Sequence, residues 1–163
     1  KNIFFLDKKE ISDNINSNKI VDEFFVFKNY PSEIKVEIKK TKFIALTKKN
    51  QQSYFIGSNG NLIRSDNSEN NLPFVFGKID VKNFLKIKNI IDNSDFNFDE
   101  IRNFYYFKSK RWDLETNEGL VIKLPLKGIE PSLNILTNLY KKKEYKDMKM
   151  IDFRQNKQII INE

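Results

Sequence analysis

Apolar and charged residues alternate most regularly in residues 33–40. Three apolar side chains share one face of this segment: Ile34, Val36 and Ile38. A period of two predicts a half-buried antiparallel strand. Residues 21–28 also have the composition of a strand, and Pro31 marks the turn between the two segments. The sequence therefore predicts a hairpin over residues 21–40.

A short helix is predicted before this hairpin. Asp7 and Glu10 form a capping box, in which Asp7 accepts from first-turn amides and Glu10 reaches back. Ile11 and Ile15 then fall on one helical face. The polar residues 16–18 end the helix, so the first unit is helix–strand–strand.

The rest of the chain alternates mainly between strands and short turns. Strands are predicted at residues 43–47, 53–56, 98–108, 112–116, 120–124, 148–153 and 158–162. Polar residues 48–52 are the predicted loop between the first two strands, and residues 58–61 form a tight turn. Residues 72–77 are a short apolar run bounded by turn residues.

Two helices interrupt these strands. Asp80 is placed to cap the first helix, which carries apolar residues at helical spacing. Pro131 lies in the first turn of the second helix, which presents Leu133, Leu136 and Tyr140 to a core. Strands joined by short loops outnumber helices, which indicates an α+β fold with antiparallel sheets. We find neither repeats nor a low-complexity linker.

Composition removes several kinds of chemistry. The 163 residues include no Cys and no His. This excludes disulfides, Cys-ligated zinc, thiol catalysis and the Ser-His-Asp triad in this chain. No apolar run approaches the roughly 20 residues that span a bilayer. The chain begins at Lys1 without a Met or a signal-peptide pattern, so we expect it to be part of a longer protein.

Two local patterns mimic catalytic or metal-binding motifs. Ser32 and Lys35 match the Ser-x-x-Lys spacing, but the serine lies in a turn and does not open a helix. Asp95 begins a segment like a calcium loop, yet Glu100 replaces the required glycine and Tyr106 replaces the final glutamate. No Gly-rich phosphate loop is present, so we predict a binding module with no catalytic residue, cofactor or metal.

The net charge is +7. Basic proteins are attracted to nucleic acid, but the lysines are scattered along the chain. The densest run, residues 141–143, lies at the predicted end of a helix, where cations favour the helix dipole. A solvated helix end is therefore favoured over a nucleic-acid patch, and no nucleic-acid partner is predicted.

The most informative segment is the predicted hairpin that begins with Arg-Trp-Asp-Leu at residues 111–114. The lone Trp112 suits either an interface anchor or a core residue, and the core is favoured because Leu114 shares its face. Arg111 and Asp113 face the other way, where a surface role is expected. The turn follows at residues 117–119. Residues 120–124 then form the returning strand, in which apolar residues again occupy every second position.

The order of these motifs resembles a known family. Residues 11–38, with Tyr-Pro-Ser before the alternating strand, resemble a POTRA domain. The later motifs resemble the β domain of the bacterial cell-division family FtsQ/DivIB, in its proteobacterial form. They are Tyr-Phe-Ile at 54–56, Gly-Asn-Leu at 60–62, Leu-Pro at 72–73, Arg-Trp-Asp-Leu at 111–114, Glu-Gly-Leu at 118–120 and Ile-Asp-Phe-Arg at 151–154.

This resemblance implies a domain organisation and a function. Residues 1–41 would be a POTRA domain without its first strand, and residues 42–163 the β domain. The chain would be the periplasmic region of a single-pass inner-membrane protein, with its transmembrane helix upstream. As a divisome scaffold it would recruit FtsB- and FtsL-type partners for septal cell division. A POTRA module of an outer-membrane secretion or assembly factor is the alternative.

The last strand, residues 158–162, is short, β-branched and close to the chain end. Such a strand either exposes an edge for β-augmentation or closes the sheet with Ile160 packed inward, and the residues alone leave both open. The resemblance favours the exposed edge. The predicted partner-binding residues are Met150, Asp152, Arg154, Gln155, Gln158, Ile159, Ile160 and Ile161.

Overall fold

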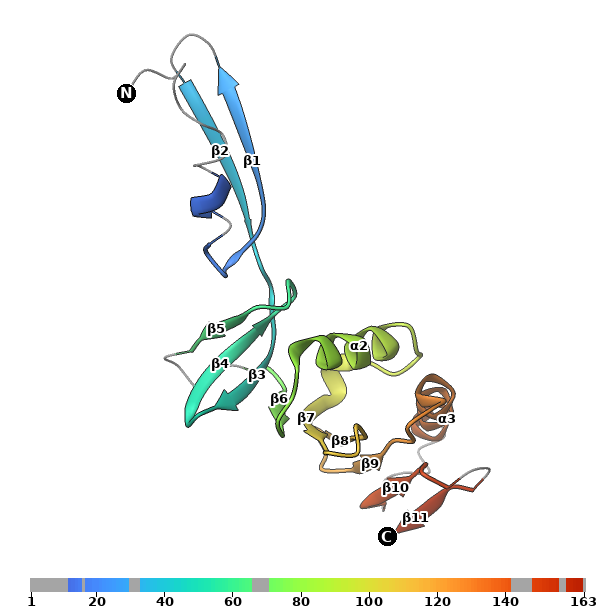
Figure 1. Cartoon of the computed structure of the whole chain (residues 1–163). Coiled ribbons are helices and arrows are strands. Elements are labelled where there is room, and N and C mark those ends of the chain that lie inside the picture. The colour runs from blue at the N-terminus through green and yellow to red at the C-terminus, as the bar shows by residue number, and fades with distance from the viewer. Residues whose placement is uncertain are drawn as a thin grey trace.

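The computed structural model describes residues 12–15, 17–29, 33–65, 71–141, 148–155 and 158–162. The predicted capping box at Asp7 and Glu10 lies outside these residues, as do Ile11 and the turn at Pro31. Residues 12–15 are helical, in agreement with the predicted first helix. Figure 1 shows two units in sequence, a slender one at the N-terminus and a larger one that holds the remaining elements.

The N-terminal unit is built on a two-stranded antiparallel sheet. Strand β1 (Val21–Asn29) pairs with β2 (Glu33–Lys40), and Val26 lies opposite Val36. The predicted hairpin is therefore confirmed. Its predicted burial is only partly correct, because Val36 is 39% exposed and Ile38 is 52% exposed.

The larger unit is built on a nine-stranded sheet of order β11-β10-β9-β8-β7-β6-β3-β4-β5. Its strands are β3 (Phe43–Lys49), β4 (Gln52–Gly57), β5 (Leu62–Arg64), β6 (Phe74–Phe76), β7 (Ile101–Tyr106), β8 (Trp112–Thr116), β9 (Val121–Lys123), β10 (Met150–Asp152) and β11 (Ile160–Asn162). Most neighbours are antiparallel, as predicted. Three neighbouring pairs are parallel, namely β3–β6, β6–β7 and β9–β10.

Helices α2 (Val81–Asp92) and α3 (Ile129–Lys141) pack on one face of this sheet (Figure 1). The Asp80 side chain accepts a hydrogen bond from the backbone N–H of Lys82 at 3.1 Å, which confirms the predicted cap. Leu133 and Leu136 are fully buried, as expected. The side chain of Tyr140 lies outside the described residues.

The core is formed by one cross-strand row of apolar residues beneath the helices. Registers across the sheet align Val75, Phe104, Leu114, Ile122 and Ile151, none of them more than 1% exposed. From the helices, Phe84, Ile87, Ile91, Leu133 and Leu136 pack on this row. The α+β fold class is confirmed.

Two local predictions are wrong. The loop predicted at residues 48–52 is only a two-residue turn, because Asn50 and Gln51 both adopt positive φ and let β3 and β4 continue. The long strand predicted from residue 98 instead begins with a 3-10 turn (Phe98–Glu100), since the Asn97 side chain accepts from the backbone N–H of Asp99 at 3.0 Å.

Candidate functional site

Strand β11 forms the edge of the nine-stranded sheet. It pairs with β10 on one side, and its other side has no neighbour among the described strands. An unpaired edge offers backbone N–H and C=O groups to another chain. This confirms the predicted edge position of residues 160–162.

The side chains at this edge are apolar and exposed. Ile159, Ile160 and Ile161 are 41%, 45% and 42% exposed. Ile160 therefore does not pack inward, and the alternative in which it closes the sheet is wrong. Ile161 lies beside Ile151 and so continues the core row into β11. The row therefore ends at the sheet edge in a partly exposed isoleucine.

A row of charged residues crosses the opposite face of the sheet toward this edge. Registers place Asp113 beside Lys123, Lys123 beside Asp152, and Asp152 beside Ile160. Asp113 and Asp152 are only 5% and 4% exposed. The expected surface role of Asp113 is therefore wrong. Arg111 covers it, with Nε donating to its carboxylate at 3.1 Å.

Asp152 is held by Arg154, two residues along the same chain. The Arg154 Nε donates to both carboxylate oxygens, at 2.8 and 2.9 Å, and the Arg154 backbone N–H donates at 2.9 Å. Hydrogen bonding by the Arg154 side chain lowers the pKa of Asp152 below its ordinary value of 3.8, although burial opposes the shift. The carboxylate therefore stays ionised beside the edge strand.

A groove of about 870 Å³ lies between this edge and α3. Its apolar lining includes Leu126 and Ile135, which are 63% and 43% exposed, as well as Ile159. The charged residues that line it are Arg111, Lys127 and Arg154, and no acidic residue lines it within the described part of the chain. Arg111 and Arg154 are paired with Asp113 and Asp152, so Lys127 is the lining cation without a carboxylate partner among the described residues. The groove therefore suits an apolar segment with an acidic side chain near Lys127.

The structure divides the predicted partner-binding residues into three groups. Arg154, Gln155, Gln158 and Ile159 line the groove. Ile160 and Ile161 form the edge. Met150 and Asp152 lie one strand further in, and Asp152 is engaged by Arg154.

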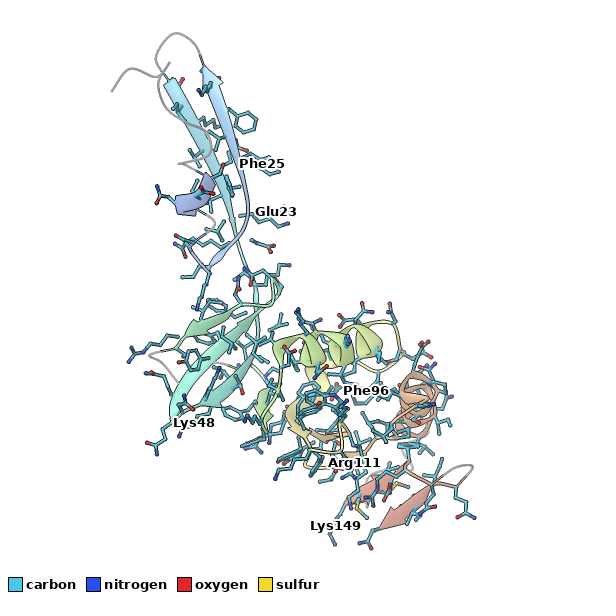
Figure 2. All side chains as sticks on the ribbon, in the orientation of Figure 1. Glu23, Phe25, Lys48, Phe96, Arg111 and Lys149 are labelled. Carbon is cyan, nitrogen blue, oxygen red and sulfur yellow. The ribbon has the colours of Figure 1, made fainter. Side chains whose placement is uncertain are left out.

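Sequence reasoning missed the other wall of the groove. Leu126 and Lys127 precede α3, Ile135 projects from it, and Arg111 lies before β8. For Arg111 the sequence had indicated a surface role. For the rest of this wall the available signal was Ile135, an apolar residue outside the helix face predicted for the core. Figure 2 shows Arg111 and Lys149 on this C-terminal side of the larger unit.

The hairpin tryptophan belongs to the core, as predicted. Trp112 is 5% exposed and meets Phe104 edge to face, with ring centroids 6.1 Å apart. Among the described residues no group of acidic side chains is arranged to hold a metal ion. The described helices are also too short or too polar to cross a membrane. Ser32 lies outside the described part.

Residues 45–154 match the family model of the C-terminal part of cell division protein FtsQ/DivIB. The chain belongs to the FtsQ/DivIB family. Members of this family are membrane-anchored cell-division proteins. This match favours a division protein over the secretion-factor alternative.

Individual relatives agree. The chain is 27% identical to cell division protein FtsQ of Rickettsia bellii, over 98% of this chain and 61% of that protein. It is 22% identical to FtsQ of Bradyrhizobium diazoefficiens, over 98% of this chain and 48% of that protein. The chain thus spans about half to three fifths of the FtsQ proteins it matches.

A solved structure is also similar, the major extracytoplasmic domain of DivIB from Geobacillus stearothermophilus. Its TM-score is 0.46 at 12% identity, over 66% of this chain and 98% of that domain.

Proposed function

We propose that this chain is the periplasmic region of a divisome scaffold that recruits FtsB- and FtsL-type partners for septal cell division. A transmembrane helix upstream anchors it in the inner membrane. It acts by binding and carries no catalytic residue. Residues 1–41 are its POTRA domain and residues 42–163 its β domain, a division supported by two sheets that share no strand.

The observation that carries the proposal is the exposed edge of β11. A partner strand laid along it gains main-chain hydrogen bonds and covers Ile160 and Ile161, which are now nearly half exposed. The groove beside the edge extends this surface. Arg111 and Arg154 are already paired with aspartates, so a partner that pairs with β11 is expected to carry an acidic residue that reaches Lys127.

The main experiment measures binding of the periplasmic segment of the cognate FtsB-type protein by calorimetry. Ile161→Pro removes a backbone donor on the free side of β11, because the register turns the Ile160 backbone toward β10, and it should abolish measurable binding. Ile161→Val, which keeps the strand, should bind nearly as well. Circular dichroism verifies that both variants retain the folded sheet. Equal affinity of the proline variant and the parent would contradict strand addition at β11.

A charge reversal tests the groove separately. Lys127→Glu reverses a cation in the groove lining and should weaken binding about tenfold or more, which corresponds to about 1.4 kcal/mol or more of charge repulsion. Lys82→Glu makes the same change on α2, outside the groove lining, and should have a smaller effect. Equal losses from the two variants would mean that only net charge matters.

A further inference from the structure

The two sheets are joined by a very short connection. Strand β2 ends at Lys40 and β3 begins at Phe43, so Thr41 and Lys42 alone link them. A flexible linker between domains is usually longer and rich in Gly, Ser or Pro. Hydrogen bonds around this short connection hold the two units against each other.

The turn between β4 and β5 meets this connection from the larger unit. Figure 1 shows this turn at the foot of the β1–β2 sheet. The Asn59 side-chain amide donates to two backbone carbonyls of the N-terminal unit, those of Lys19 at 3.1 Å and Val21 at 3.0 Å. Its carbonyl oxygen accepts from the backbone N–H of Asn61 at 3.1 Å. One side chain therefore links the turn to the other unit.

Thr41 completes the contact from the connection. Its hydroxyl accepts from the backbone N–H of Asn59 at 3.2 Å, and its own backbone N–H donates to the Ile20 carbonyl at 2.8 Å. The backbone N–H of Ser58 donates to the Lys42 carbonyl at 2.8 Å. Thr41 is only 7% exposed.

Gly57 shows how closely these groups are packed. A Cβ at this position would lie 2.6 Å from the Asn59 side-chain oxygen and 2.9 Å from the Thr41 hydroxyl. Both distances are shorter than van der Waals contact. A glycine here lets Asn59 and Thr41 approach each other across the junction.

We propose that Asn59 is a lock residue that fixes the direction of the N-terminal unit relative to the nine-stranded sheet. Its side-chain amide bonds the first unit and its backbone N–H bonds Thr41 in the connection, while its side-chain oxygen is bonded within the second unit. Breaking it should free the two units to reorient without unfolding either one. Asn59 would thereby hold the β1–β2 sheet at a fixed angle to the sheet whose edge is β11.

The test uses Asn59→Asp, which keeps the acceptor for the Asn61 amide but removes both donors to the N-terminal unit. Asn50→Asp is the matched control, because it adds the same charge at the opposite end of β4, in an exposed turn. Since the chain has no cysteine, spin labels can be attached at Lys35→Cys and Lys86→Cys alone. Double electron–electron resonance then reports the distance between the units.

The lock predicts a narrow distance distribution for the parent and for Asn50→Asp, and a clearly broader one for Asn59→Asp. The exchange rate of the Thr41 amide should rise about tenfold or more in Asn59→Asp, as expected for two lost hydrogen bonds. The Ile122 amide in the core should change much less. An unchanged distance distribution and unchanged Thr41 exchange in Asn59→Asp would overturn the proposal, whereas broadening without a loss of melting temperature would support it.

Discussion

The ion pair between Asp152 and Arg154 is expected to stabilise the C-terminal part of the sheet. Arg154→Met removes the guanidinium but keeps most of the aliphatic stem. Loss of one partner of a fully buried pair costs about 3–5 kcal/mol. Here Arg154 is 40% exposed on its side chain, and Asp152 keeps the backbone N–H of residue 154 and the neighbouring Lys123. We therefore expect a loss of about 1–3 kcal/mol in the free energy of unfolding.

The sign of the pH dependence follows from the lowered pKa of Asp152. Its contribution is fully present above the unfolded-state pKa, near 3.8, and is lost as the pH falls through the lower folded-state value. Arg154→Met removes the main cause of this shift. The parent should therefore exceed the variant in stability at pH 7, and the difference should shrink as the pH falls below about 4.

Urea denaturation at several pH values, followed by circular dichroism, measures both effects. Asp152→Asn with Arg154→Met completes a double-mutant cycle, in which the combined loss should be smaller than the sum of the single losses. A stability difference between the parent and Arg154→Met that stayed constant from neutral to acid pH would refute the electrostatic account. The loss would then come from the packing of the guanidinium group, independent of the charge on Asp152.

Three further predictions concern the core, a turn and the helix-free face. Phe104→Ala, at a fully buried site that meets Phe84 and Trp112, should cost about 3–5 kcal/mol in the free energy of unfolding by urea titration, and a loss below 1 kcal/mol would contradict its core role. Gly77→Ala should destabilise by about 1–3 kcal/mol in the same assay, because φ is 107° and the new Cβ meets the Tyr106 carbonyl. The pKa of Tyr105 is raised by its hydrogen bond to Glu115 and by burial. Glu115→Ala removes the acceptor and should lower that pKa toward 10 in a ring-resonance NMR titration, and an unchanged pKa would exclude the hydrogen bond as the cause.

The positions of most helices and strands could be predicted from local sequence signals. Asp80 caps α2 because its side chain has an amide partner two residues away, which a sequence pattern displays directly. Gly119 supports the hairpin turn through its positive φ. The prediction of a loop at residues 48–52 was wrong because the two turn residues, Asn50 and Gln51, are not glycines. Glycine is the residue that usually marks a two-residue turn with positive φ.

Burial of polar residues could not be predicted from local patterns. Asp113 alternates with core residues, so its charge indicated a solvent-facing side chain. In the structure it is buried, because Arg111 covers it and Lys123 lies beside it in the register with β9. Strand β10 adds Asp152 and Arg154 to the same face, and its parallel pairing with β9 leaves no periodic signal in the sequence.

The same long-range pairing explains why the candidate binding surface was only half predicted. The residues alone left open whether Ile160 is exposed or packed inward, and the resemblance to FtsQ/DivIB favoured the exposed edge that β11 forms. The groove instead joins residues 126–127 and Ile135 to residues 153–155 and 158–159, segments that meet only because β10 lies beside β9 and α3 precedes it. Strand β11 itself has three residues and reaches the sheet only through β10. The ion pair of buried Asp152 with Arg154, in and beside β10, is therefore expected to stabilise the edge on which a partner strand would form.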